Sequence, residues 1–179
     1  MMWETVKLGE ILEVQNGYAF ESKKFSHSSG MPLIRIRDLK KGMNTEIRYE
    51  GEFEKKYIVR SKDLLIGMDG EFRCYEWNGD DALLNQRVCR LKIIKTESIL
   101  PKFIFYTLNN KLKEIEDVTS FITVKHISSK EILNIDFLLP PIAEQQIILA
   151  KLDNSFFEIN KLINLNKEAL RQKQKLEEN

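Results

Sequence analysis

The stretch Leu138-Leu-Pro-Pro-Ile-Ala-Glu-Gln-Gln146 divides this 179-residue chain into two parts of different character. All eight glycines lie at or before Gly79, whereas residues 142–179 contain neither glycine nor proline. The paired prolines suit a first helical turn, and the glutamate after them complements the positive end of a helix dipole. We therefore expect a globular domain over residues 1–140 and one long helix over residues 141–179. An unbroken helix from residue 142 onward would be about 57 Å long at 1.5 Å per residue.

The long helix carries an apolar stripe wider than the two-position seam of a simple coiled coil. In a heptad frame that begins at Leu152, apolar residues recur at three positions, which is typical of a helix that packs on more than one neighbour. Packing on its own domain could cover the first turns, but a rod of this length overhangs a domain with a radius of gyration of about 14 Å. We therefore expect a partner helix. The predicted packing residues are Ile148, Leu152, Phe156, Ile159, Leu162, Ile163, Asn166 and Leu170, of which Asn166 would set the register.

The composition is that of a globular protein with nearly balanced charge. Residues 141–179 carry six basic and six acidic residues, so the net charge of +1 belongs to residues 1–140 and any nucleic-acid surface must be a local patch. No apolar run reaches the ~18 residues of a membrane span, and the N-terminus does not resemble a signal peptide, so we expect a cytoplasmic protein without a membrane partner. Cys74 and Cys89 lack zinc-site spacing and are predicted to be buried thiols.

Short alternating runs separated by turn residues predict a β-rich domain, and with the long helix they predict an α+β fold. One further helix is expected from Pro101 to about Glu116. The predicted strands are 31–38, 57–60, 63–70, 87–94 and 132–139. On the first of these strands, Arg35 and Arg37 would share one face, with Lys40 and Lys41 at its end.

The sequence lacks the usual motifs of catalytic sites. It has no glycine-rich phosphate loop, no nucleophile elbow and no His-Glu-x-x-His motif, so we expect no cofactor and no metal. Leu139-Pro-Pro-Ile differs from the Asn-Pro-Pro-aromatic signature of amino-methyltransferases at the amide and at the aromatic residue. Asp38, Glu54 and Lys56 could be forced into the pattern of a metal-dependent nuclease, but their surroundings are typical of a solvated loop.

Polar and basic side chains near the predicted turns indicate a surface that binds DNA. Arginine suits bidentate contact with guanine or phosphate, lysine suits phosphate, and an amide such as that of Gln86 can contact adenine. The loop 123–128 offers hydroxyl, amine and imidazole groups, which suit contacts to phosphates. The alternative is that Arg35 and Arg37 pair with acidic neighbours across the sheet and that Asn85 and Gln86 cap strand ends.

Seven segments follow one another in a characteristic order. They are Trp3–Glu10, Asn16–Phe20, Pro32–Leu39, Asp63–Gly70, Leu84–Val88, Val124–Ser128 and Leu139–Gln146. This order, which covers essentially the whole chain, resembles that of type I restriction-modification specificity subunits. The Pro-Pro-x-x-Glu-Gln junction is its most specific element. The resemblance implies one target recognition domain followed by one conserved-region helix, in either a half-length subunit or a fragment of a full one.

The resemblance also implies a function. A specificity subunit performs no chemistry, recognises a bipartite sequence in double-stranded DNA, and holds methyltransferase and restriction subunits on it. A single-domain chain would restore the two-domain arrangement as a homodimer paired through its helix. The residues that the resemblance implies as contacts to the DNA backbone are Tyr18, Lys23, Arg35, Arg37, Lys40, Asp69, Arg73, Gln86, Arg87, Lys125 and His126. The competing expectation is a coiled-coil interaction protein whose globular domain binds protein and not DNA.

Overall fold

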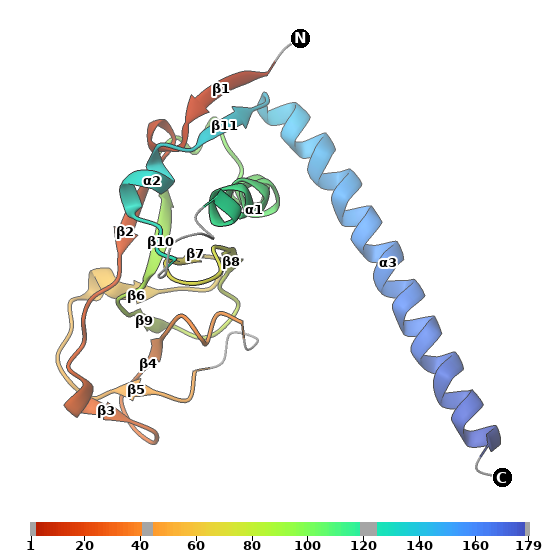
Figure 1. The fold of residues 1–179 in the computed structure, drawn as a ribbon, viewed down its shortest axis with the longest axis horizontal. Helices are drawn as coiled ribbons and strands as arrows, with labels where there is room; N and C mark the ends of the chain where they lie inside the picture. The colour runs from red at the N-terminus through yellow and green to blue at the C-terminus, as the bar shows by residue number, and fades with distance from the viewer. Residues whose placement is uncertain (1–2, 41–44, 119–124, 178–179) are drawn as a thin grey trace. The chain divides into compact units, whose positions relative to one another are not determined.

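The computed structural model describes residues 3–40, 45–118 and 125–177, and its contacts divide the chain into two compact units (Figure 1). The first unit comprises Met1–Pro140 and is built mainly from short strands. The second comprises Pro141–Asn179 and contains the single helix α3 (Ile142–Glu177) of 36 residues. The α+β fold with a long C-terminal helix is therefore confirmed.

The first unit combines eleven described strands with two α-helices and three short 3-10 turns. These elements are β1 (Glu4–Lys7), η1 (Leu8–Glu10), β2 (Leu12–Asn16), η2 (Ser22–Lys24), β3 (Phe25–Ser26), β4 (Met31–Ile34), β5 (Arg48–Tyr49), η3 (Lys55–Tyr57), β6 (Ile58–Val59), β7 (Leu64–Gly67), β8 (Cys74–Glu76), β9 (Ala82–Leu84), β10 (Val88–Ile93), α1 (Pro101–Val118), α2 (Ser129–Leu133) and β11 (Asp136–Leu139).

The described strands form three sheets. Strands β1 and β11 pair as an antiparallel ribbon, and the order β2-β10-β7-β8 forms an antiparallel sheet of four strands. The third sheet has the order β3-β5-β4-β9-β6, in which only β4 and β9 run parallel. Segments distant in sequence therefore lie side by side, which brings polar loops together at the strand ends.

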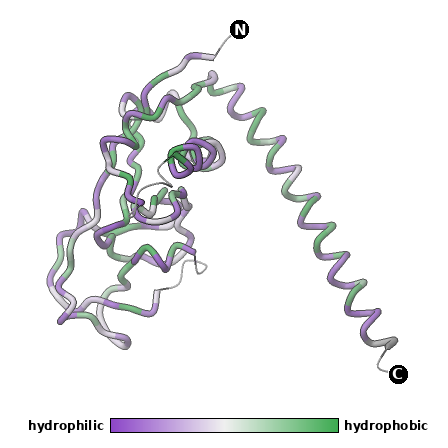
Figure 2. Tube along the Cα trace, in the orientation of Figure 1, coloured by the Kyte–Doolittle hydropathy of each residue, from purple (hydrophilic) through white to green (hydrophobic). Residues whose placement is uncertain are grey.

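The five-stranded sheet has a hydrophobic cluster on each face. Neighbouring residues of β4 point to opposite faces, so Leu33 packs with one cluster and Ile34 with the other. Leu83 and Leu84 divide in the same way on β9. Burial on both faces explains why these strands are continuous apolar runs without polar alternation. The helix α3 differs from these strands, because hydrophobic and hydrophilic residues alternate along it (Figure 2).

A buried arginine connects the two larger sheets. Arg90 on β10 donates hydrogen bonds to Asp63 and to Gln15, each at 2.7 Å, and to the main-chain carbonyls of Lys56 and Ile58 at 2.9 and 2.7 Å. The alternating sequence of residues 87–94 predicts a half-exposed strand, but this prediction is wrong, because Val88 to Leu91 are all buried.

All five predicted strands are shorter in the structure, and for two of them a local turn or helix explains the loss. The first ends at Ile34, because the buried Asp38 carboxylate accepts a hydrogen bond from the Arg35 amide at 2.9 Å and holds a turn. Arg35 and Arg37 therefore do not share a strand face. Residues 132–139 are only partly a strand, since a capping box of Ser128 and Glu131 starts α2. Lys41, Thr123 and Val124, which were part of the predicted basic and hydroxyl-rich segments, lie outside the described residues.

No helix in the described parts of the chain combines the length and hydrophobicity that crossing a membrane would require.

Candidate nucleic-acid interface

The segment that follows β7 is the centre of a cluster of polar loops. Its main chain is held on both sides: the Met68 amide donates to the Arg87 carbonyl at 2.9 Å, and the Met68 carbonyl accepts from Ile127 at 2.9 Å. The Gly70 amide donates to the carbonyl of Lys125 at 3.0 Å. Three segments that are far apart in sequence are therefore fixed beside one another by main-chain hydrogen bonds.

Within this cluster, one carboxylate binds two exposed basic side chains. Asp69 Oδ2 accepts from Arg87 Nη1 at 2.6 Å, and Asp69 Oδ1 lies 2.7 Å from His126 Nδ1. Burial raises the pKa of Asp69, but the hydrogen bonds and positive charges of His126 and Arg87 outweigh this effect, so its pKa is lowered overall. The Asp69 side chain is 24% exposed, against 59% for Arg87 and 47% for His126. The side chains of Arg87 and His126 thus face solvent, and the Asp69 carboxylate lies beneath them.

Arg87 has an unusual main-chain conformation. Its φ is +72°, and Lys62 is the only other non-glycine residue with positive φ among the described residues. This region is uncommon for residues with a side chain and is found where the surroundings impose it. Here the next residue begins β10, and the preceding amide of Gln86 donates to the Tyr18 carbonyl at 2.8 Å. The Gln86–Arg87 turn is therefore fixed at both sides.

Several predicted DNA-binding cations around the same segment are paired with acids. Lys40 is hydrogen-bonded to Glu71, which raises the pKa of the lysine and lowers that of the glutamate. Lys125 Nζ lies 3.3 Å from the buried Glu116, whose carboxylate also accepts from the Phe72 amide at 3.2 Å. These ion pairs reduce the positive charge of the surface and fix its loops.

Arg73 differs from these lysines, because no salt bridge within 4 Å involves it in the described parts of the chain. Its guanidinium carbon lies 6.0 Å from the centroid of the Tyr75 ring, and the side chain is exposed. A cation over an aromatic face retains its charge and remains accessible to an anion. Arg73 is therefore the side chain of this cluster best suited to a phosphate.

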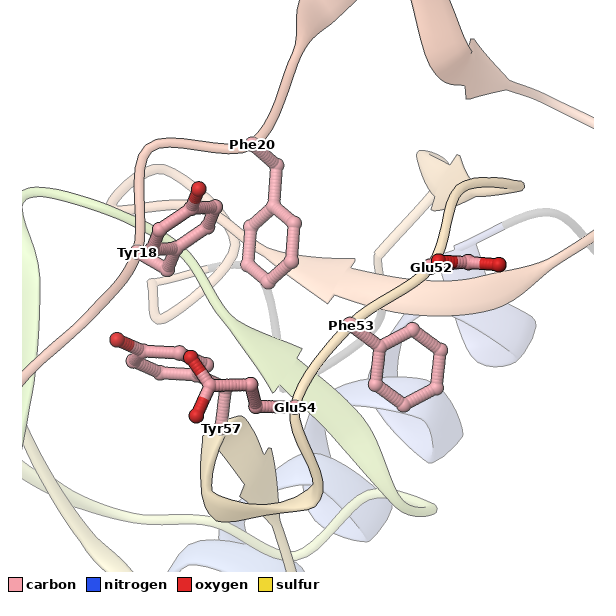
Figure 3. Close-up of a pocket in the computed structure, with 6 residues that line it drawn as sticks. All are labelled: Tyr18, Phe20, Glu52, Phe53, Glu54 and Tyr57. Carbon is pink, nitrogen blue, oxygen red and sulfur yellow. The ribbon is translucent and has the colours of Figure 1, made fainter.

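Tyr18 lines a separate hollow of about 280 Å³ with Phe20, Glu52, Phe53, Glu54 and Tyr57 (Figure 3). The rings of Tyr18 and Tyr57 are 5.2 Å apart between centroids, and those of Tyr18 and Phe20 are 5.1 Å apart. Figure 3 shows these three rings together on one side of the hollow and Phe53 with Glu52 on the other. Aromatic faces beside two carboxylates do not suit a phosphate. The side chain of Tyr18 therefore lies in different surroundings from the side chains of the basic cluster.

The structure brings some predicted DNA-binding residues together and leaves others apart. The basic cluster, defined by the segment 68–73 and its neighbours, contains Lys40, Asp69, Arg73, Gln86, Arg87, Lys125 and His126. Lys23 instead pairs with Glu21 at 2.9 Å on the exposed turn η2, and Arg35 pairs with Asp38 at 3.3 Å. Arg37 is exposed on the turn after β4. Arg35 thus pairs with an acid, as the alternative expected, but the acid lies three residues later in the same turn and not across the sheet.

Two acids of the cluster were missed by reasoning from the sequence. Glu71 lies between the predicted contacts Asp69 and Arg73, but the sequence does not show that Lys40 lies beside it. Glu116 lies on α1, and no motif pointed to it. The side chains proposed for a nuclease are otherwise engaged: Asp38 is buried beside Arg35, and Glu54 pairs with Lys56 at 2.7 Å. In the described parts of the chain, no three His, Cys, Asp or Glu side chains gather as metal ligands would.

The predicted packing residues of α3 become more exposed along the helix. Ile148 and Leu152 are half-buried, whereas the following members of the stripe and the register residue are exposed. These exposed residues are Phe156, Ile159, Leu162, Ile163, Asn166 and Leu170. Phe157 and Leu165 are exposed apolar residues beside the stripe. The apolar surface on α3 is therefore large.

Comparison with known proteins identifies the family. A family model described as the type I restriction modification DNA specificity domain matches residues 2–172. The specificity subunit of the Escherichia coli type I restriction enzyme EcoBI is 39% identical over 159 residues, covering 88% of this chain and 33% of the relative. The MjaVIII specificity subunit of Methanocaldococcus jannaschii is 27% identical over 188 residues, covering 97% and 43%.

Solved structures share the fold. The HsdS subunit from Thermoanaerobacter tengcongensis matches with a TM-score of 0.69 and 21% identity, covering 89% of this chain and 39% of that one. A chain from a structural study of type I R-M complex assembly and conformational transition matches with a TM-score of 0.71 and 22% identity, covering 89% and 40%. This chain thus spans less than half the length of these proteins. The resemblance noted in the order of segments is confirmed, and the chain belongs to the family of type I restriction-modification DNA specificity domains.

Proposed function

We propose that this chain recognises one half of a bipartite sequence in double-stranded DNA and docks the methyltransferase and restriction subunits of a type I system. The observation that carries the proposal is the family match over residues 2–172. It favours this function over a coiled-coil interaction protein that does not bind DNA. Such an assembly would act in the cytoplasm, where it meets DNA.

The chain would itself be non-catalytic. Burial raises the pKa of the Cys74 thiol strongly and that of the Cys89 thiol to about 12, so neither sulfur is a ready nucleophile at neutral pH. Several charged side chains of the basic cluster are held in ion pairs that fix its loops, as the pairs Lys40–Glu71 and Lys125–Glu116 illustrate. Strand cleavage and methyl transfer would belong to the partner subunits.

The basic cluster is the proposed DNA-binding surface. It brings basic side chains from separate loops together, with the loops fixed by main-chain hydrogen bonds, and Arg73, which has no salt bridge in the described parts of the chain, is the leading proposed contact to a phosphate. The hydroxyl and imidazole groups of Ser128 and His126 lie on the same loop as Lys125. Lys23 and Arg37 lie outside the basic cluster and remain proposed DNA contacts.

The helix α3 would provide the second half of the assembly. At 36 residues it is about 54 Å long, and its exposed apolar stripe exceeds what monomeric proteins usually leave in water. A second copy of the chain could cover it in a twofold arrangement, which would present two identical recognition domains. The target would then consist of two identical half-sites separated by a spacer that the helix length sets.

The experiment that tests DNA binding is a salt titration with the purified chain and duplex DNA. We expect binding whose affinity falls steeply with salt concentration, because cations of the chain replace counterions on phosphates. Arg73→Ala should weaken binding to all sequences and reduce the slope of log K against log salt by about 0.9. Lys92→Ala, at the other end of β10, removes the same charge outside the basic cluster and should leave the slope unchanged. Binding that does not depend on salt would refute the proposal.

Partner and target can be obtained together. Co-purification with the methyltransferase subunit of the same system, followed by mapping of methylated adenines, would return the docking partner, the recognised sequence and the spacer. A chain that binds DNA but never co-purifies with a methyltransferase subunit would contradict the docking part alone.

A further inference from the structure

We propose that Arg87 contacts the edge of a guanine and that Asp69 is the positioning residue that holds it there. The inference rests on the proposed DNA-binding function and assigns a base-specific contact within the basic cluster. It replaces the expectation that Arg87 contacts the DNA backbone.

The first argument is the geometry of the side-chain pair. Asp69 occupies only one donor of the Arg87 guanidinium, because it accepts from Nη1 at 2.6 Å. Within the described residues the guanidinium has no other hydrogen-bond partner. Nε, Nη2 and the second hydrogen of Nη1 remain available on a side chain that is 59% exposed. A planar fork with two parallel donors matches the O6 and N7 acceptors that guanine presents in the major groove.

The second argument is rigidity. The Arg87 main chain is held at φ +72°, with its carbonyl bound to the Met68 amide. Asp69 cannot turn away easily, because its other oxygen is bound to His126 and the two residues also form a main-chain bridge. An arginine held at its main chain and at one guanidinium nitrogen loses little further freedom on binding. Selecting one base requires such a fixed direction, whereas a phosphate contact tolerates a flexible chain.

The third argument is charge, and it decides against a phosphate. The Asp69 carboxylate already balances the Arg87 guanidinium, and the same negative charge would repel a phosphate brought to this position. Guanine O6 and N7 are neutral acceptors, so the carboxylate does not oppose them. Arg73 shows the contrasting arrangement, since it is exposed over an aromatic ring and lacks a salt bridge among the described residues.

The test uses the full chain co-expressed with its methyltransferase subunit, and the methylated motif is mapped for wild type and variants. Arg87→Gly removes the side chain and relieves the left-handed main chain, so the variant should fold. Lys62→Gly is the matched control, because Lys62 has φ +77° and a salt bridge to Glu76 at 2.8 Å. We expect Arg87→Gly to lose preference for guanine at one position of each half-site by roughly 5- to 150-fold, while Lys62→Gly keeps the full motif.

Asp69→Asn separates positioning from charge. Removal of the carboxylate should increase affinity for non-specific duplexes, because it removes a repulsive charge, and should weaken the preference at the same guanine. Folding of each variant is checked by its thermal unfolding curve. If Asp69 had only a structural role, its substitution would change how much of the motif is methylated, but the base preference would not weaken at one position alone.

The outcomes distinguish this inference from the proposed function. A wild-type chain that yields no motif and no salt-dependent DNA binding overturns both. A wild-type motif that stays unchanged in Arg87→Gly overturns the guanine contact alone. A uniform loss across sequences, with the salt slope reduced by about 0.9, would mean that Arg87 contacts a phosphate and would also overturn it.

Discussion

At the scale of single residues, acidic partners decide what the basic side chains of this protein can do. Lys40, Lys125 and Arg87 each bind a carboxylate, whereas Arg73 has an aromatic neighbour. On a surface of this kind, the few unpaired cations contribute most of the affinity for DNA, and the paired cations are held in fixed orientations. The nearly neutral charge of the chain is therefore compatible with specific DNA binding.

Gly17 tests how tightly the loops behind this surface are packed. A Cβ at Gly17 would lie 2.0 Å from the main-chain oxygen of Asn85, which cannot move without disturbing the Gln86–Arg87 turn. We expect Gly17→Ala to lower the free energy of unfolding by about 2–3 kcal/mol, measured by urea denaturation. Gly70→Ala is the control: it has φ +76° but open space around it, and should cost only about 1 kcal/mol. Equal losses would show that the close approach to Asn85 relaxes freely.

At the scale of elements, the sequence predicts best where one local signal agrees with the packing. The glycine-free stripe predicts α3, Pro101 marks the start of α1, and the apolar run 63–70 contains β7. Strands β5 and β9 were missed, because two or three residues carry too little periodicity for recognition. Their existence depends on pairing with β4, a contact between segments distant in the sequence.

The same limit applies to the candidate site. The resemblance implied Asp69, Arg87 and His126 as candidates, and the structure brings the three side chains together. Arg35 was misjudged because a side chain three residues later competes with strand pairing for its main-chain amide. Such local competition leaves no periodic signal, and the pairing of Asp69 with Arg87 spans 18 residues. Which cations remain available to DNA therefore follows only from the three-dimensional contacts.

The capping box of α2 gives a prediction with a pH dependence. Hydrogen bonds from the Ser128 hydroxyl and amide lower the pKa of Glu131 below its usual value of 4.5. A lowered pKa stabilises the fold above pH 4.5, and this contribution is lost as the pH falls through the lowered value. Ser128→Ala should cost about 1 kcal/mol at pH 7 and progressively less below pH 4.5, measured by urea denaturation at several pH values.

A neighbouring serine provides the control for this prediction. Ser129 Oγ donates to the neutral Asn16 side chain at 2.6 Å, so the cost of Ser129→Ala should not change over the same pH range. If both substitutions respond to pH alike, Glu131 is not the titrating group.

At the scale of the whole molecule, the two units divide the proposed work between them. Residues 1–140 hold the loops proposed to contact DNA, and α3 holds the apolar stripe proposed to bind a second copy. The separation of two half-sites would then depend on how the helices pair, not on the recognition surface. Substitutions in residues 1–140 should accordingly leave pairing through α3 unchanged, and substitutions in α3 should leave the DNA contacts of residues 1–140 unchanged.

Leu162 lies in the middle of the exposed stripe and tests this division. Leu162→Glu places a charge where the partner helix would pack, so we expect light scattering to give the 21.1 kDa mass of one chain, against twice that mass for the wild type. Lys161→Glu changes charge at the adjacent residue outside the stripe and should leave the dimer intact. On a duplex with a single half-site, the Leu162→Glu monomer should bind with the same slope of log K against log salt as the wild type, because the basic cluster is intact. On a duplex with both half-sites, it should lose the affinity gained from two linked domains. A wild-type chain that stays monomeric at high micromolar concentration would contradict pairing through α3, since its apolar stripe would then require a different partner.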